Sequence, residues 1–236
     1  MDYVTEIIEL IRKNRISTTE VADALGKFGS VQGLIPLSPL KFAVGKIKCV
    51  VPINDSNYMV HREIETLEPG DILFIRPKGF TDVAVFGDLV AKYAILYKQA
   101  AAIVVEGNVR DTARLVREQY PIWCFGSNPV GAINMIAHTK TEELDSARMS
   151  ISNGIAVCDE GGVVIIEKER LNEELLGKLH HIEALEDLWH YCMNTLKWST
   201  YDIVVKKRYL EDRDLIPKDL LPVSYTHLTL PTSDLV

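Results

Sequence analysis

A short β-branched run between two helical stretches is the feature that most constrains the fold of this chain. Residues 102–108 read Ala-Ile-Val-Val-Glu-Gly-Asn, an apolar run closed by a glycine turn, which is typical of a buried strand. An apolar helical pattern over residues 83–98 precedes the run, and Asp111 begins another helical pattern after it. A helix that leads into a buried strand, with polar groups at the outer end of each, is how an α/β fold builds a pocket.

The rest of the chain repeats this alternation of helix and strand. Ser17, followed three residues later by Glu20, forms a capping-box pattern that begins a helix. Strands that alternate with helices predict an α/β domain. The expected helices cover residues 5–12, 17–27, 57–66, 83–98 and a segment from Asp111, and the expected strands cover residues 43–51, 71–76, 102–105, 121–124, 155–158 and 163–166.

Composition narrows the class of protein. The 236 residues are enough for one domain with an appendage, and 47% apolar with 25% charged residues is ordinary for a globular protein. A net charge of -7 argues against a generic binder of nucleic-acid backbones, which needs a basic face. Because the cysteines lie far apart without paired spacing, we expect reduced thiols, not a zinc site or disulfides. They are Cys49, Cys124, Cys158 and Cys192.

The two ends of the chain differ from its centre. The first six residues are acidic without an apolar core, and no stretch is long enough to span a bilayer. We therefore expect no signal peptide, no membrane partner and a cytoplasmic protein. From residue 169 the sequence is charged and leucine-rich, which predicts a helical extension. Within it a solvated helix face is favoured over a metal site for His180, His181, Glu186 and His190.

Three polar residues flank the central helix and strand. Asp88 lies near the start of the expected helix, and Arg110 with Asp111 follows the strand. An arginine fork beside a carboxylate suits a small acid bound to a hard metal ion: Arg110 would grip a carboxylate, and Asp111 would supply oxygen to Mg²⁺ or Mn²⁺. Two alternatives remain open. Asp111 could be an N-cap of the next helix, and Arg110 could be a solvated surface charge.

A series of motifs on both sides of these residues resembles one family. The matching pieces occur at residues 17–25, 37–45, 61–62, 69–73, 86–89, 106–111, 126–129 and 159–164. In this order they resemble the RraA-like family over about residues 16–166. The family includes class II 4-hydroxy-4-methyl-2-oxoglutarate aldolases and regulators of ribonuclease E activity.

The resemblance implies a fold and a domain organisation. It predicts a swivelling-type α/β/α sandwich with a barrel-like mixed sheet, in which residues 1–168 form the RraA-like domain and residues 169–222 a helical C-terminal extension. Residues 223–236 resemble a translated sequencing adapter, so we expect them to carry no function. The family also implies a homotrimer or hexamer with its active site near a subunit boundary.

The resemblance also implies a reaction. In the family's enzymes a 2-oxo acid is cleaved through a pyruvate enolate with the help of a divalent metal, Mg²⁺, Mn²⁺ or another. Asp111 would hold the metal, Arg110 would contact substrate oxygens, and Asp88 with a water would act as general acid or base. Oxaloacetate decarboxylation passes through the same enolate. The pyruvoyl carboxylate would be received by the backbone around Gly87, Leu89 and Val90.

Several positions depart from the pattern or allow two interpretations. Between Asp88 and Arg110 lie 21 residues, one more than the family spacing, so the connection around residues 99–101 is expected to be altered and Asp88 could sit off its place. Residues 137–152 read as a polar, partly helical segment. Two interpretations of Glu106 remain open. Its carboxylate could orient a neighbour, either Arg110 or a water bound to the metal, or it could be a strand-end charge that faces solvent. His61 is expected to be a packed or hydrogen-bonded helix residue, not a catalyst.

Functions of other classes remain as alternatives. The regulators of the family bind a protein partner such as a ribonuclease, and they keep the arginine but lack the acidic residue after it. Because Asp111 is present here, the enzyme is favoured. A third possibility is a binding module for a 2-oxo acid or another metabolite.

Overall fold

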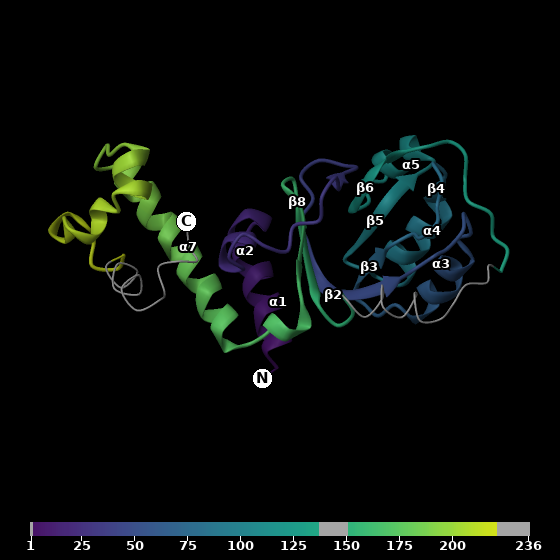
Figure 1. Ribbon diagram of the computed structural model, residues 1–236, viewed down its shortest axis with the longest axis horizontal. Coiled ribbons are helices and arrows are strands. Elements are labelled where there is room, and N and C mark those ends of the chain that lie inside the picture. Colours follow the sequence, from purple (N-terminus) through teal and green to yellow (C-terminus); the bar gives the residue numbers. More distant parts are fainter. Residues whose placement is uncertain (1, 137–150, 221–236) are drawn as a thin grey trace.

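The strands form one mixed sheet that curls into a nearly closed barrel, as predicted (Figure 1). The computed structural model describes residues 2–136 and 151–220, so most of the expected segment at 137–152, namely residues 137–150, and the tail at 223–236 lie outside the described residues. The strands are β1 (Ile35–Pro36), β2 (Ala43–Val50), β3 (Ile72–Ile75), β4 (Ala84–Phe86), β5 (Ala102–Val109), β6 (Ile122–Ser127), β7 (Ile155–Asp159) and β8 (Gly162–Ile166).

Helices cover the sheet on two sides (Figure 1). α3, α4 and α5 pack beside β3 to β6, and α1, α2 and the long α7 pack beside β2, β7 and β8. The α-helices are α1 (Tyr3–Asn14), α2 (Thr18–Ala24), α3 (Tyr58–Glu63), α4 (Asp88–Lys92), α5 (Thr112–Arg117) and α7 (Glu173–Asn194). Short 3-10 helices cover Ile64–Thr66, Lys168–Arg170, Arg208–Leu210 and Arg213–Leu215, and π-helical turns cover Tyr93–Tyr97 and Tyr201–Val205.

The strand order is β1-β6-β5-β3-β2-β7-β8. Strand β4 lies off this path and pairs with β5. The pairs among β2, β3, β5 and β6 are parallel, whereas β1, β7 and β8 join the sheet antiparallel. The central strands are buried along most of their length because both of their faces are covered, which explains their nearly continuous β-branched sequence. The predicted hairpin is confirmed, with Asp159 opposite Gly162.

Helix α2 is fixed to the hairpin of β7 and β8 by a buried carboxylate. Asp159 accepts hydrogen bonds from the backbone N–H of Thr18 at 2.7 Å, from Thr18 Oγ1 at 2.6 Å and from the N–H of Gly161 at 2.7 Å. Hydrogen bonds to a charged group contribute about 1.5 to 3 kcal/mol each, and this one is shielded from solvent. The predicted capping box of Ser17 and Glu20 is also present, so α2 begins where the sequence indicates.

The expected helix at residues 83–98 is wrong at its start. Ala84–Phe86 form strand β4, because the outer end of β5 offers them backbone hydrogen bonds that a free helix would not have. The helix itself begins at Asp88 and changes at Tyr93 to a π-helical turn. For the same reason, β5 extends to Val109, beyond the predicted residues 102–105, since both β4 and β6 pair with its last residues.

The C-terminal segment contains the long helix α7, and its division from residues 1–168 as a separate extension stays a prediction. α7 buries Leu175, Leu179 and Ile182 in the cluster that also contains the apolar faces of α1 and α2. Beyond α7 the short helices pack around its end (Figure 1). In the described parts of the chain, none of the helices has the length and apolar character needed to cross a membrane.

Candidate active site

The outer ends of β4 and β5 bring three of the predicted residues together. The strands are parallel, so their carboxyl ends lie at the same edge of the sheet, where α/β proteins place their ligand sites. The backbone N–H of Arg110 continues this pairing by donating to the carbonyl of Phe86 at 3.0 Å. Asp88 follows β4, and Arg110 and Asp111 follow β5, so all three residues line one cleft.

Asp111 occupies the N-cap position of α5 without capping that helix. Its backbone is left-handed, with φ 58° and ψ 30°, and its side chain makes no hydrogen bond to the first turn of α5. Instead, Oδ2 accepts from the backbone N–H of Asp88 at 3.3 Å and lies 3.6 Å from Nε of Arg110. Asp111 therefore stands at the N-cap position, but its side chain does not cap the helix. The side chain is 42% exposed and lines the cleft.

Two glycines leave the space that Arg110 occupies. A Cβ on Gly87 would overlap Oδ2 of Asp111 and would lie 3.0 Å from Cγ of Arg110. A Cβ on Gly131 would overlap the guanidinium of Arg110. The side chain of Arg110 thus runs between two backbone segments that only glycine allows to approach so closely. This packing fixes the direction of a side chain that is otherwise half exposed.

Arg114 is a site residue that the sequence analysis missed. Its guanidinium forms an ion pair with the Asp88 carboxylate, across from α5 to the first turn of α4. The hydrogen bond from Arg114 is the main cause that lowers the pKa of Asp88 below its usual value of 3.8. The available signal was its spacing: Arg114 follows Asp111 by one helical turn, so both side chains lie on the same side of α5.

These residues line an open cleft of about 530 Å³. Both guanidiniums and both carboxylates of the cleft come from the two loops at the sheet edge and from α5. Its lining residues are Asp88, Arg110, Asp111, Thr112, Ala113, Arg114, Ser127, Asn128 and Pro129.

A small recess of about 70 Å³ lies behind the turn of Gly87 and Asp88. His61 and Asn57, one turn apart on and before α3, line it together with Arg110 and Asp111. The amide nitrogen of Asn57 donates to the carbonyl of Val85 at 3.1 Å, whereas its buried Oδ1 has no hydrogen-bond partner in the described residues. His61 is exposed on its helix, yet it borders the site more closely than the sequence suggested.

Glu106 has a different partner from the one proposed for it. Its two carboxylate oxygens accept from Nε and a terminal nitrogen of Arg76 at 2.7 and 2.8 Å, so it binds that guanidinium with both oxygens. Neither interpretation from the sequence, orientation of Arg110 or a charge free in solvent, describes this arrangement. The parallel pairing of β3 with β5 places the two residues at neighbouring strand ends.

The remaining predicted binding positions flank the first turn of α4. The side chain of Leu89 is 76% exposed, whereas that of Val90 is buried in the core. Their backbone N–H groups belong to the start of the helix that continues into the π-helical turn. Their proposed role as receivers of a carboxylate stays a prediction.

The acidic and imidazole groups of α7 do not converge. His181 is buried, which lowers its pKa, so the expected solvated face is wrong for this residue. His180 and His190 are exposed. In the described residues no group of three or more histidine, cysteine or acidic side chains is placed to hold a metal ion. All four cysteines are buried and none forms a disulfide, and burial raises the pKa of Cys124 to about 11.

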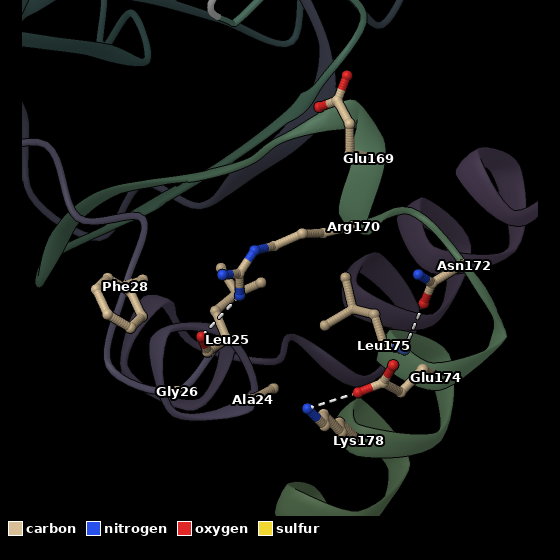
Figure 2. Close-up of a pocket in the computed structure, with 10 residues that line it drawn as sticks. All are labelled: Ala24, Leu25, Gly26, Phe28, Glu169, Arg170, Asn172, Glu174, Leu175 and Lys178. Carbon is tan, nitrogen blue, oxygen red and sulfur yellow. Dashed lines mark hydrogen bonds and ion pairs between the residues drawn. The ribbon is translucent and has the colours of Figure 1, made fainter. Parts of the chain in front are cut away.

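A second cavity of about 370 Å³ lies between the end of α2 and the start of α7 (Figure 2). Three of its four charged side chains already have partners. Arg170 donates to the carbonyl of Leu25 at 2.9 Å, and Lys178 pairs with Glu174 at 2.9 Å, as the dashed lines in Figure 2 show. Because these side chains already bind other groups of the protein, the cleft at the sheet edge is the better candidate for chemistry.

Comparisons with known proteins identify the family of this chain. The model of the RraA-like family, described as Aldolase/RraA, matches residues 18–165. The chain belongs to the RraA-like family. A protein of Halalkalibacterium halodurans with the provisional name 4-hydroxy-4-methyl-2-oxoglutarate aldolase is 28% identical over 193 residues, covering 78% of this chain and 85% of its own. Protein DlpA of Legionella pneumophila is 26% identical over 184 residues, covering 72% of this chain, which spans only 29% of DlpA.

Solved structures of RraA-like proteins share the fold. An uncharacterized protein of Pseudomonas syringae pv. tomato superposes with a TM-score of 0.64 at 19% identity, covering 81% of this chain and 93% of that one. Streptomyces coelicolor RraAS2, described as an unusual member of the RNase ES inhibitor RraA family, gives a TM-score of 0.57 at 22% identity, covering 76% and 94%. At these identities the likeness concerns the fold alone.

Proposed function

We propose that this RraA-like protein is a divalent-metal-dependent lyase that cleaves a 2-oxo acid through a pyruvate enolate. The reaction is of the 4-hydroxy-4-methyl-2-oxoglutarate aldolase or oxaloacetate decarboxylase type. The observation that carries the proposal is the meeting of Asp88, Arg110 and Asp111 in one cleft, with Arg110 held between two glycines. The relative from Halalkalibacterium halodurans supports the same class by its name.

The chemistry of the donors fits Mg²⁺ or Mn²⁺. Asp111 offers a hard carboxylate at the cleft, and the described residues contain no cage of three or more ligating side chains. Magnesium commonly takes one or two carboxylates and completes its shell with water and substrate oxygens, so a single acidic residue beside an open cleft suits it. A divalent metal held by Asp111 would polarise the keto and carboxylate oxygens of the substrate.

Two side chains and one backbone segment of the protein would each have a separate role in the reaction. The guanidinium of Arg110 would bind substrate oxygens and stabilise the negative charge that develops on the enolate. The lowered pKa of Asp88 keeps its carboxylate ionised at neutral pH, so Asp88 would accept a proton through a water before returning it. The backbone around Gly87, Leu89 and Val90 would orient the pyruvoyl carboxylate.

The test is pyruvate release from oxaloacetate and from 4-hydroxy-4-methyl-2-oxoglutarate, with added Mg²⁺ or with a chelator. A blank without protein corrects for spontaneous decarboxylation. We expect metal-dependent turnover that falls sharply in Arg110→Ala and Asp111→Ala. Arg117→Ala is the matched control, since Arg117 lies on α5, pairs with Glu118 and does not line the cleft. Absence of metal-dependent turnover, or full activity in both site variants, would contradict the proposal.

The family's other function is the alternative. Streptomyces coelicolor RraAS2 and an RNA-processing inhibitor from Thermus thermophilis share the fold, and a regulator of this kind would bind a ribonuclease without turnover. The acidic residue after Arg110 favours the lyase. A cytoplasmic location and a homotrimer or hexamer stay predictions that accompany the proposal.

A further inference from the structure

Two guanidiniums line the active-site cleft, and the proposed chemistry uses only one of them. Arg110 comes from the end of β5, and Arg114 comes from the first turns of α5. Arg110 lies against Asp111, which is the proposed metal ligand. Arg114 is the cation that the pyruvoyl end of a substrate leaves unused.

The partner of Arg114 shows what its guanidinium binds. It forms an ion pair with the Asp88 carboxylate inside the cleft, although the arginine side chain is 60% exposed. An ion pair so open to solvent contributes little to stability, so a carboxylate from a ligand can replace or share it at small cost. The Asp88 carboxylate thus occupies a position where a carboxylate of a bound acid could also be received.

The charges of the cleft favour a doubly charged ligand. Asp88 and Asp111 carry two negative charges, and Arg110 and Arg114 carry two positive charges. A divalent cation at Asp111 would leave the cleft with two positive charges in excess. A 2-oxo acid with a second carboxylate is a dianion and balances this excess, whereas a 2-oxo monoacid does not.

We propose that Arg114 is a specificity-determining residue that binds the distal carboxylate of a 2-oxo dicarboxylic acid. The inference rests on the proposed function, because it takes the pyruvoyl end of the substrate to lie at Arg110 and Asp111. The two ends of one small acid would then lie between the loop after β5 and the first turns of α5, within a cleft of about 530 Å³.

The test compares two acids of equal length by titration calorimetry in the presence of Mg²⁺. 2-Oxoglutarate carries the distal carboxylate, and 2-oxopentanoate has a methyl group in its place. We expect the native protein to bind 2-oxoglutarate about tenfold more tightly, which is the scale of one charge-assisted hydrogen-bonded pair. Arg114→Gln should abolish this preference and leave the affinity for 2-oxopentanoate unchanged. Arg117→Gln, one turn along α5, is the matched control and should keep the preference.

The outcomes separate this inference from the lyase proposal. Equal affinity of the native protein for the two acids, no binding of either acid, or a preference that survives in Arg114→Gln would overturn the role of Arg114. Each of these results is independent of turnover, because neither acid needs to be cleaved. Failure of the proposed function would instead appear as no metal-dependent release of pyruvate, whatever the binding preference. A cooperative thermal unfolding transition of Arg114→Gln confirms that the variant is folded.

Discussion

The backbone N–H of Asp88 donates to Oδ2 of Asp111 at 3.3 Å. The side chain at the N-cap position of α5 therefore accepts a hydrogen bond from the first turn of α4. This bond joins the loop after β4 to the loop after β5. Because the same carboxylate lies 3.6 Å from Nε of Arg110, one side chain sets the relative positions of three groups. A change at Asp111 should therefore affect both metal affinity and the placement of its neighbours.

Replacement of Gly131 by alanine should disable the site with little loss of stability. The new Cβ would overlap the flexible end of Arg110, which can swing away into solvent. We expect at least about a tenfold loss of kcat/KM on oxaloacetate, on the scale of one lost charge-stabilising contact. Gly177→Ala is the control, because a Cβ there meets nothing within 4 Å and should stabilise α7 by up to about 1 kcal/mol. Unchanged kinetics in Gly131→Ala would contradict the placement of Arg110.

Asp111→Asn should separate metal binding from folding. The amide oxygen of asparagine can still accept from the N–H of Asp88, but the negative charge is lost. We expect Mn²⁺ affinity, measured by calorimetry, to fall about 10 to 100-fold, with a melting temperature close to the native value. Asp187→Asn, at an exposed position of α7, should change neither quantity. Retention of native Mn²⁺ affinity would remove Asp111 as the metal ligand.

The pair of Asp88 and Arg114 should contribute a pH-dependent part of stability. The pKa of Asp88 is lowered in the folded protein, chiefly by its hydrogen bond with Arg114. A lowered carboxyl pKa stabilises the fold at pH above the ordinary value of 3.8, and that contribution disappears as pH falls through the lowered pKa. Melting temperatures of the native protein and Arg114→Gln should therefore differ at pH 6 and converge toward pH 3. A difference that stays constant over this range would argue against the pair.

Glu106→Gln should lower stability without touching catalysis. Glu106 binds Arg76 with both oxygens, and both side chains are less than a quarter exposed. Weakening this bidentate pair should cost about 1 to 3 kcal/mol of unfolding free energy, measured in denaturant. Metal-dependent pyruvate release should stay at the native level, because Arg110 does not contact this pair. A loss of activity in Glu106→Gln without a loss of stability would indicate that Glu106 acts in the active site.

Local signals in the sequence gave reliable predictions where the structure is decided locally. The capping box of Ser17 and Glu20 joins residues three apart, and the β-branched run of β5 is buried whatever lies beside it. The sequence pattern around Arg110 and Asp111 likewise placed both residues directly after a strand, where β5 ends at Val109. These features depend on neighbouring residues, so a single sequence contains them.

The identity of charge partners could not be predicted in the same way. Arg114 and Asp88 are 26 positions apart, and Arg76 and Glu106 are 30 positions apart. Their pairing depends on which strand ends lie side by side, which is a property of the folded sheet. The short strand β4 was missed for a related reason: its three apolar residues fit a helical pattern until the outer end of β5 is available to pair with them.

The π-helical turn at Tyr93–Tyr97 is a place where the helix can take up the additional residue between Asp88 and Arg110. A π turn contains more residues than an α turn, so an inserted residue widens the helix and leaves both of its ends where they were. The backbone N–H of Lys98 accordingly donates to the carbonyl of Tyr93, five residues earlier, at 3.0 Å. Because a helix can change from α-helical to π-helical winding, the number of residues between two motifs gives the length of chain between them. It does not give their distance in space. Relatives with insertions of this kind should be compared by the strand ends that carry the motifs.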